Sequence, residues 1–178
     1  MLVEINNLTH NIICDLRYAK ENNFTQKVIY KKEICLIHKD ALVLLERAIE
    51  LALRQNLRLK IFDAFRPKAA QEKLWQLCPN DKYVMPPSKG SVHTRGIAVD
   101  LTLVDANGND LDMGSSFDDF TEKSHHGYNH PPLINMNRYL LLGIMTTAGF
   151  DFFYNEWWHY QMFYPKNYEL IENNHEIM

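Results

Sequence analysis

The β-branched, apolar run at residues 97–104 constrains the fold of this chain more than any other segment. An Asn107-Gly108 pair follows the run, and this dipeptide favours the tight two-residue turn of a β-hairpin. A strand that turns back at once pairs with an antiparallel neighbour, whereas parallel strands need a long crossover. We therefore expect the run to lie in an antiparallel sheet.

Two helices and a second strand are expected around this sheet. Apolar residues recur at helical spacing over about residues 39–55, and residues 134–148 predict a second apolar helix that ends at Gly149, a favoured left-handed cap. Residues 58–62 alternate between polar and apolar, as a strand does. Because helices and strands are segregated and do not alternate in βαβ units, we expect the α+β class, with helices packed on a small antiparallel central sheet.

The composition is that of one globular domain spanning residues 1–178. An apolar content of 46% can build one core at this length, and the chain contains neither an internal repeat nor a linker. A formal net charge of -3 provides no broad basic surface. We therefore expect neither a nucleic-acid partner nor a membrane partner.

The sequence also favours a cytoplasmic location. The first seven residues lack the charged and apolar regions of a signal peptide, and no apolar run approaches the roughly 18 residues of a membrane span. Cys14, Cys35 and Cys78 are scattered and odd in number. This pattern indicates reduced thiols and not a disulfide framework.

Irregular segments separate the expected elements. Prolines and a glycine at residues 77–92 predict a surface loop. Residues 113–132 also lack periodicity, and since loops of that length usually have a function, we expect this one to cover a site. Pro67 ends the preceding strand and can begin a helix, which places Arg66 at a strand-to-helix junction. Residues 157–164 are aromatic and are predicted to form a strand.

Residues 91–100 combine a histidine and a carboxylate. His93 precedes Asp100 by seven residues, and Gly96 allows a turn between them. On the predicted strand, Ala98 shares a face with Asp100. A small side chain beside a carboxylate leaves room for a metal ion and its water.

Residues 155–159 bring a second carboxylate and a second imidazole. If the strand begins at Trp157, His159 shares a face with it, and Glu156 comes from the preceding turn. Two histidines, an aspartate and a spare glutamate are a suitable set for catalytic zinc, in which three side chains hold the ion and a nearby carboxylate takes a proton from water. Spacing alone leaves a structural role for each histidine open.

Other side chains could compete for these roles. His125, His126 and His130 lie in the irregular segment, where neighbouring side chains point to opposite sides, so we expect them to support the ligands at most. The cysteines lack the C-x-x-C spacing of zinc sites and are expected to pack in the core. Taken alone, Arg66 is more typical of a surface ion pair.

Two patterns in the chain carry a resemblance to a known family: Ser91-x-His93-x-x-Gly96-x-Ala98-x-Asp100 and Glu156-Trp-Trp-His159. They are similar to the paired motifs of the VanX-type D-Ala-D-Ala dipeptidases. These belong to a larger group of zinc peptidases that includes D,D-carboxypeptidases and L-alanyl-D-glutamate endopeptidases. Further stretches at residues 16–25, 63–67 and 113–126 favour the dipeptidase branch, so the similarity covers about residues 15–164.

The resemblance implies a fold like that of the Hedgehog and DD-peptidase group, with a zinc site on the sheet and a small D,D-dipeptide as the substrate. It implies one zinc ion per chain, held by His93, Asp100 and His159. The implied catalytic residues are Glu156, as general base and later proton donor, and Arg66, which stabilises the oxyanion. The implied substrate-binding residues are Tyr18, Ser91 and Asp118.

The sequence departs from the resistance enzymes of this family at a few positions. Val92 and Ile97 stand where small or polar residues are expected, and the loop at residues 77–90 looks shorter. One alternative is therefore an enzyme of the same group that acts on a longer chain, as a D,D-carboxypeptidase or peptidoglycan endopeptidase. A second is a non-catalytic zinc domain used for binding, although such a site would need neither Glu156 nor Arg66.

Overall fold

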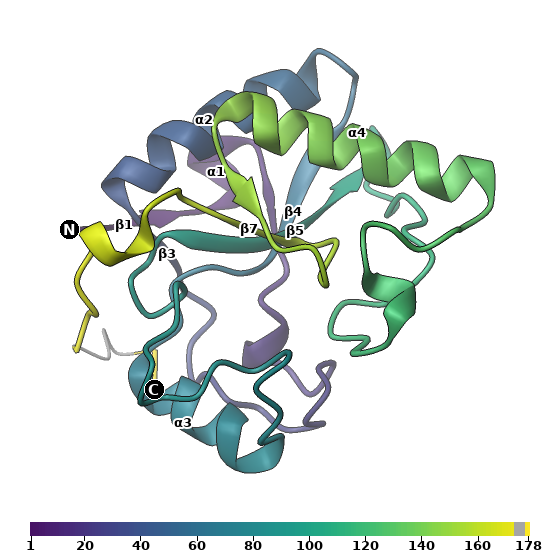
Figure 1. Ribbon diagram of the computed structural model, residues 1–178. Coiled ribbons are helices and arrows are strands. Elements are labelled where there is room, and N and C mark those ends of the chain that lie inside the picture. The colour runs from purple at the N-terminus through teal and green to yellow at the C-terminus, as the bar shows by residue number, and fades with distance from the viewer. Residues whose placement is uncertain (173–176) are drawn as a thin grey trace.

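The computed structural model describes residues 1–172 and 177–178 and consists of regular elements joined by long irregular segments (Figure 1). The strands are β1 (Leu2–Ile5), β2 (Ile13–Cys14), β3 (Cys35–His38), β4 (Arg58–Asp63), β5 (Ala98–Val104), β6 (Asp151–Phe152) and β7 (His159–Gln161). The α-helices are α1 (Asn7–His10), α2 (Lys39–Leu53), α3 (Lys68–Leu77) and α4 (Pro132–Ala148). Short 3-10 helices are η1 (Arg17–Ala19), η2 (Glu122–Ser124) and η3 (Pro165–Asn167).

Five strands form the central sheet in the order β2-β4-β5-β7-β6. Its neighbouring strands are antiparallel except for β2 and β4, which run parallel. Strands β1 and β3 form a separate antiparallel pair. The predicted α+β class and the small, mainly antiparallel sheet are confirmed.

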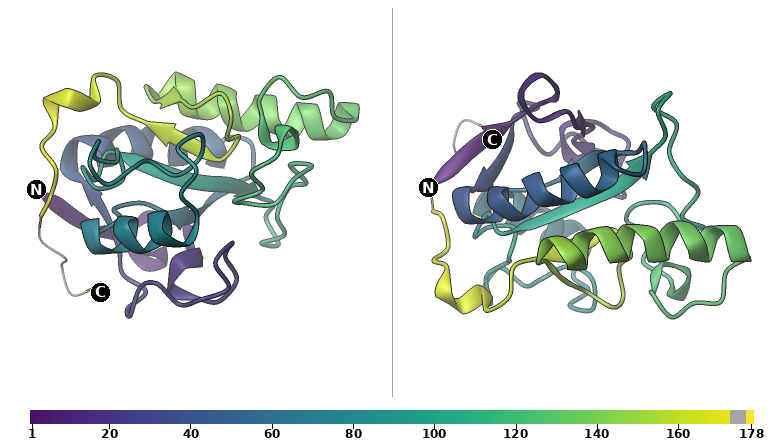
Figure 2. Two further views of the ribbon diagram at one scale, coloured as in Figure 1. Left: turned by 60° about the horizontal axis from the view of Figure 1, so that its bottom comes forward. Right: turned by 90° about the horizontal axis from the view of Figure 1, so that it is seen from above.

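The two faces of the central sheet have different surroundings. Helices α2 and α4 lie side by side against one face, and α3 lies beyond the other (Figure 2). On β5, Val99, Leu101 and Leu103 join the core cluster formed with α2 and α4. Because side chains alternate along a strand, Asp100 faces the opposite side. The sheet thus presents an apolar face to the helices and a polar one at the other side.

The predicted helices form where their sequence patterns place them. The segment predicted at residues 39–55 corresponds to α2, whose buried side chains recur at helical spacing. Gly149 follows α4 with a φ of 112°, a left-handed conformation that glycine adopts without a steric penalty. Helix α3 begins at Lys68, directly after Pro67. Local sequence therefore determines where these helices begin and end.

The expected β-hairpin after residue 104 forms only in part. Its turn is present, because the carboxylate of Asp105 accepts hydrogen bonds from the backbone N–H groups of Asn107 and Asn109. The returning arm, however, makes a single isolated bridge between Val104 and Asp110. Strand β7 pairs only with Ala98–Asp100 of β5, and the returning chain donates one hydrogen bond, from the N–H of Leu111 to the carbonyl of Leu103 at 2.9 Å. It then leaves β5 without forming a regular second strand.

The strand expected at residues 157–164 is also shorter than predicted, since β7 spans only His159–Gln161. Trp157 and Trp158 belong to a turn in which the N–H of His159 donates to the carbonyl of Glu156 at 3.2 Å. Both tryptophans are buried, and their rings meet edge to face at a centroid distance of 5.4 Å. His159 therefore does not share a strand face with Trp157, as the sequence suggested.

The long irregular segment at residues 113–131 is fastened to α4 by one buried arginine. Arg138 donates hydrogen bonds to the backbone carbonyls of Met113 at 2.6 Å, Lys123 at 2.7 Å and His125 at 3.0 Å. It also reaches the hydroxyl of Ser115 at 3.3 Å. A guanidinium has five donors in a fixed fork, so one side chain can hold several carbonyls of an otherwise irregular chain.

The remaining expectations about the fold concern thiols and membranes. Cys14, Cys35 and Cys78 all have free thiols, as predicted. Within the described part of the chain, none of the helices has the length and apolar character needed to cross a bilayer.

The role of Arg138 can be tested by substitution. We expect Arg138→Met to lower the free energy of unfolding by about 3 kcal/mol, because it leaves buried carbonyls without donors. The substitution should also speed proteolysis within residues 113–131. Chemical denaturation and limited proteolysis with mass mapping measure both effects. Arg47→Met, at an exposed position of α2, is the matched control and should change stability by less than about 0.5 kcal/mol. Equal stability of the two variants would contradict this role.

Candidate active site

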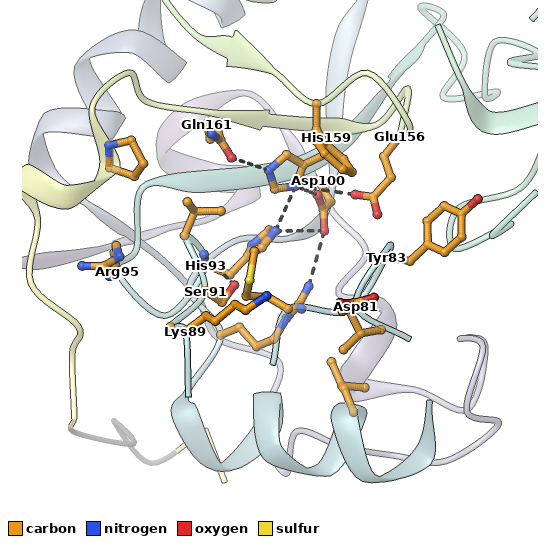
Figure 3. Close-up of a pocket in the computed structure, with 18 of the residues that line it drawn as sticks. Asp81, Tyr83, Lys89, Ser91, His93, Arg95, Asp100, Glu156, His159 and Gln161 are labelled. Carbon is orange, nitrogen blue, oxygen red and sulfur yellow. Dashed lines mark hydrogen bonds and ion pairs between the residues drawn. The ribbon is translucent and has the colours of Figure 1, made fainter. Parts of the chain in front are cut away.

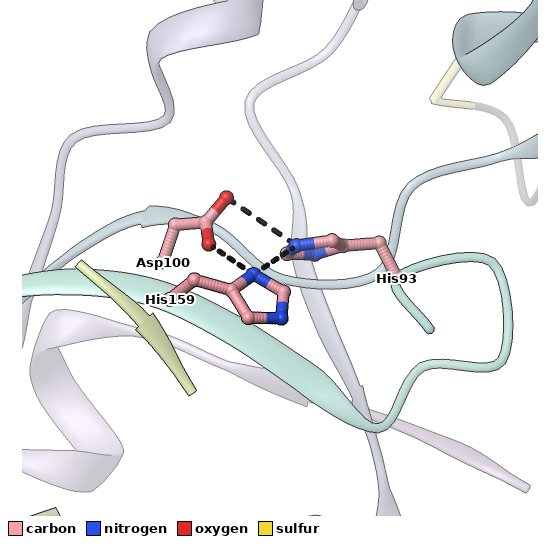
Figure 4. Close-up of side chains that lie close together, drawn as sticks. All are labelled: His93, Asp100 and His159. Carbon is pink, nitrogen blue, oxygen red and sulfur yellow. Dashed lines mark hydrogen bonds and ion pairs between the residues drawn. The ribbon is translucent and has the colours of Figure 1, made fainter. Parts of the chain in front are cut away.

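Three of the predicted site residues converge on one face of the central sheet (Figure 4). Asp100 lies on β5 directly opposite His159, the first residue of β7, in the strand register. His93 reaches the same place from the turn that precedes β5. One ligand atom from each of the three residues lies within 4.8 Å of the others, and all three residues are buried. The structure therefore assembles the group expected from the two sequence motifs.

Gly96 allows His93 to fold back onto β5. It has a φ of 71°, and its N–H donates to the carbonyl of His93 at 2.9 Å. A Cβ at this position would lie 2.7 Å from the side chain of Leu2 and 3.3 Å from the backbone nitrogen of His38. Both the conformation and the close packing require glycine here.

The hydrogen bonds of the two imidazoles fit a metal site. Nδ1 of His93 lies 2.8 Å from the carbonyl of Ala64, and Nε2 of His159 lies 3.0 Å from Oε1 of Gln161. Each of these nitrogens must be the donor, because its partner is a carbonyl oxygen. The inner nitrogens, Nε2 of His93 and Nδ1 of His159, face each other at 3.2 Å, and each can offer a lone pair to a cation when it carries no proton. Two facing lone pairs beside a carboxylate form a donor set suited to a cation, and an oxygen that accepts from the outer nitrogen is the usual support for a histidine ligand.

Asp100 completes this donor set. Its Oδ1 lies 3.0 Å from Nδ1 of His159, and its Oδ2 lies 3.4 Å from Nε2 of His93. Burial favours the neutral acid, but the neighbouring imidazoles, His93 foremost, outweigh it and lower the pKa of Asp100. Burial also opposes the charged form of His159, yet the hydrogen bond and charge of Asp100 raise its pKa. The carboxylate thus stays ionised in a buried position.

Glu156 lies beside the three candidate ligands. Its Oε2 is 3.9 Å from Nδ1 of His159, and the turn before β7 points both side chains into the same cavity. Burial raises the pKa of Glu156 to about 8, against the opposing effect of His159. Glu156 is thus a buried carboxyl group without a basic partner at contact distance other than His159 among the ion pairs of the described residues.

Arg66 lies on the other side of Asp100 and is held by partners that the sequence analysis did not assign. Its Nε and Nη2 both lie 2.8 Å from Oδ2 of Asp63, and its Nη1 donates to Gln71 at 3.0 Å. Nη2 also lies 3.6 Å from Oδ2 of Asp100. Asp63 is fully buried and also accepts a hydrogen bond from Tyr30 at 2.7 Å. The prediction of a surface ion pair for Arg66 alone is wrong, because the guanidinium is buried at the site.

The three expected substrate-binding residues line the same cavity. The hydroxyl of Tyr18 contacts both carboxylate oxygens of Asp118, at 3.1 and 3.3 Å. Desolvation raises the pKa of Asp118, and the negative charge of Asp100 adds to the rise. The hydroxyl of Ser91 accepts from the N–H of His93 at 3.2 Å, which links the pocket wall to a ligand.

The cavity has a volume of about 500 Å³, and ionisable side chains of both kinds line it (Figure 3). Arg95 and Lys89 lie on one side of the cluster, whereas Asp81 and Glu156 lie on the other. The surface loop was predicted at residues 77–92; its part after α3 forms one wall of the cavity, with Val84 buried.

His125, His126 and His130, which were expected at most to support the candidate ligands, make contacts elsewhere. His130 Nε2 pairs with the carbonyl of Lys123 at 2.8 Å, and the ring of His126 packs edge to face on Phe152. His125 Nε2 lies 3.5 Å from the hydroxyl of Tyr83. They order the irregular segment and do not support the ligands. The imidazoles are instead contacted by the carbonyl of Ala64 and by Gln161; the position of Gln161 two residues after His159 was the one sequence signal for its role.

Comparison with known proteins agrees with the motifs. Residues 1–174 match the peptidase family M15 profile described as D-ala-D-ala dipeptidase. The chain is 43% identical to the D-alanyl-D-alanine dipeptidase of Escherichia coli (strain K12), over 96% of this chain and 89% of that protein. It is 34% identical to the D-alanyl-D-alanine dipeptidase of Enterococcus faecium, over 92% of this chain and 94% of that protein. It is 31% identical to the protein of the same name from Streptomyces coelicolor, over 89% of each.

The resemblance predicted from the motifs is thus confirmed over almost the whole chain, and the buried His93, Asp100 and His159 cluster lies within the matched residues. The chain belongs to the D-Ala-D-Ala dipeptidase family of M15 peptidases.

Proposed function

We propose that this protein is a zinc-dependent dipeptidase that hydrolyses D-alanyl-D-alanine to two molecules of D-alanine. One observation carries the proposal. The buried donor set of His93, Asp100 and His159 lines the same cavity as a further carboxyl group, Glu156, and a buried guanidinium, Arg66. A purely structural metal site needs neither Glu156 nor Arg66. The family membership and the relatives named above support the same substrate.

His93, Asp100 and His159 are the residues that would hold the ion. Three protein ligands of the nitrogen and oxygen type are typical of catalytic zinc, which keeps a further position open. When bound, zinc would supply Lewis-acid chemistry, lowering the pKa of water and polarising the scissile carbonyl. The carbonyl of Ala64 and the amide of Gln161 keep the two imidazoles in the tautomers that this role requires.

Glu156 is the proposed general base. Its Oε2 would accept a proton from the attacking water, and the same oxygen would then return that proton to the leaving amine. Burial raises the pKa of Glu156, whereas a cation held by the neighbouring His93, Asp100 and His159 would favour the ionised carboxylate that accepts a proton. The turn before β7 keeps Glu156 close to His159 without making it part of the donor set.

Arg66 is proposed to stabilise the negative charge that develops on the carbonyl oxygen. Arginine stays protonated in proteins, and a fixed positive charge costs no reorganisation when the oxyanion forms. Asp63 and Gln71 hold the guanidinium from behind, and Tyr18 lies under it, with the guanidinium carbon 5.0 Å from the ring centroid. These contacts fix the direction in which Arg66 points.

The remaining polar groups would bind the two ends of a free dipeptide. Asp118, held by Tyr18, is the proposed partner of the substrate ammonium group, and Ser91 supplies a hydroxyl on the opposite wall. An ammonium beside Asp118 would favour the ionised carboxylate and so offset its raised pKa. A D,D-carboxypeptidase or endopeptidase, the alternative from the sequence, would instead need room for a peptide that continues past Asp118.

The first prediction concerns the metal. Purified protein should contain about one zinc ion per chain, because three ligands converge on one site. His93→Ala, Asp100→Ala and His159→Ala should each lose most of it, as measured by elemental analysis. His125→Ala, which removes a histidine outside the cluster, is the control and should retain the metal. Full occupancy in all three ligand variants would disprove the assignment.

The second prediction separates Glu156 from the ligands. Glu156→Gln should keep its zinc but lose turnover by roughly 10²–10⁴-fold, the usual contribution of a general base. Steady-state kinetics and metal analysis on the same preparation test both parts. Loss of the metal in this variant would show that Glu156 is a ligand.

The third prediction concerns the charge at the substrate's amino end. N-acetylation removes the ammonium and leaves Asp118 unpaired in a desolvated site, which costs several kcal/mol. We therefore expect kcat/KM for D-Ala-D-Ala to exceed that for N-acetyl-D-Ala-D-Ala by about 10³-fold or more. Asp118→Asn should narrow the gap by impairing the free dipeptide more than the blocked one. Similar rates on both substrates would favour a carboxypeptidase.

A further inference from the structure

Two aromatic rings from distant parts of the chain meet on the Glu156 side of the active-site cavity. Tyr83 comes from the loop between α3 and β5, and Phe120 follows Asp118 by two residues. Their rings are stacked, with centroids 5.0 Å apart and planes inclined by 20°. Both residues line the cavity, and Tyr83 lies beyond Glu156 on the side away from Arg95 (Figure 3). We call this stacked pair the aromatic wall.

The two halves of the aromatic wall are held differently. Phe120 packs edge to face on Phe24 at a centroid distance of 5.1 Å, and Phe24 packs in turn on Tyr18, the residue that holds Asp118. Phe120 is therefore fixed relative to the proposed ammonium site. Tyr83 is only half-buried, and its hydroxyl reaches His125 at 3.5 Å, the limit of a hydrogen bond. The ring also stacks on Phe120 and lies 5.1 Å from the ammonium of Lys82, and the backbone N–H of Tyr83 donates to the carbonyl of Asn80 at 3.1 Å.

The position of the aromatic wall affects substrate length. A peptide with one more residue at its amino end must continue past Asp118, toward the segment that carries Phe120. The stacked rings of Tyr83 and Phe120 line the cavity on this side. A longer peptide could pass only if the two rings moved apart. This obstacle is steric, and it acts on a substrate whether or not that substrate carries a positive charge.

We propose that Tyr83 and Phe120 limit the substrate to two residues by closing the cavity behind Asp118. The inference rests on the proposed dipeptidase function and deepens it, because it assigns length selectivity to a wall in addition to the carboxylate. Tyr83 is the residue to vary, since it is the less firmly held half and its removal leaves the packing of Phe24 on Phe120 in place.

The test compares hydrolysis of D-Ala-D-Ala and D-Ala-D-Ala-D-Ala by the zinc-loaded protein, with each substrate's disappearance followed by mass spectrometry. The tripeptide keeps a free ammonium group, so it probes length and not the loss of charge. In Tyr83→Ala, the ratio of kcat/KM for the tripeptide to that for the dipeptide should rise by about tenfold or more, the scale of a steric change in a pocket. Tyr83→Phe keeps the ring and should leave the ratio as in the unmodified protein. Tyr139→Ala, at an exposed tyrosine of α4, is the control for loss of an aromatic side chain elsewhere.

The outcomes distinguish a failure of the aromatic wall from a failure of the proposed dipeptidase function. An unchanged ratio in Tyr83→Ala, with the unmodified protein active on the dipeptide, overturns the aromatic wall. Failure of the unmodified protein to cleave D-Ala-D-Ala overturns the proposed function instead. Thermal unfolding of each variant verifies that it is folded, and Phe120→Leu, which shortens the other half of the wall, should raise the ratio in the same direction.

Discussion

The register of three strands is the constraint on which the site depends. Asp100 of β5 is paired with Asp63 of β4 on one side and with His159 of β7 on the other. An irregularity between Ile61 and Asp63 shifts the register so that this pairing occurs. Because side chains alternate along a strand, a slip of one residue would turn Asp100 toward α2 and α4. Asp100, His159 and Asp63, the carboxylate that holds Arg66, are therefore aligned by the backbone hydrogen bonds of the sheet.

This alignment also explains how the fold tolerates so many buried ionisable groups. Isolated buried charges are costly, and pairing and hydrogen bonds are needed to offset the cost of removing them from water. Here Asp63 is shared by Arg66 and Tyr30, and Asp100 lies between the guanidinium and the two imidazoles. Each charge has an opposite charge or a donor at contact distance, so the removal of one partner leaves another uncompensated. The site is therefore a network in which the members depend on one another.

Sequence patterns predicted the local features of the molecule better than the long-range ones. The boundaries of α2 and α4 follow from helical periodicity and from Gly149, and the motif spacing found His93, Asp100 and His159. The roles of Asp63 and Gln71 could not be found in this way, because they arise from contacts between β4, α3 and the loop that follows. Likewise, the local hairpin signal at Asn107-Gly108 predicted the turn but not that the chain leaves β5 after a single bridge at Val104 and Asp110. In each of these cases tertiary pairing decided the structure.

The proposed catalytic residues and the aromatic wall lie on different kinds of backbone. The ligands, Glu156 and Arg66 are attached to the central sheet or to the turns at its strand ends, whereas Tyr83 and Phe120 belong to irregular segments outside it. Loops accept substitutions and insertions more readily than sheet strands do. Natural selection can therefore alter which peptides enter the cavity while the hydrolytic apparatus stays intact. In this architecture, relatives with a different substrate specificity can arise from changes in two loops alone.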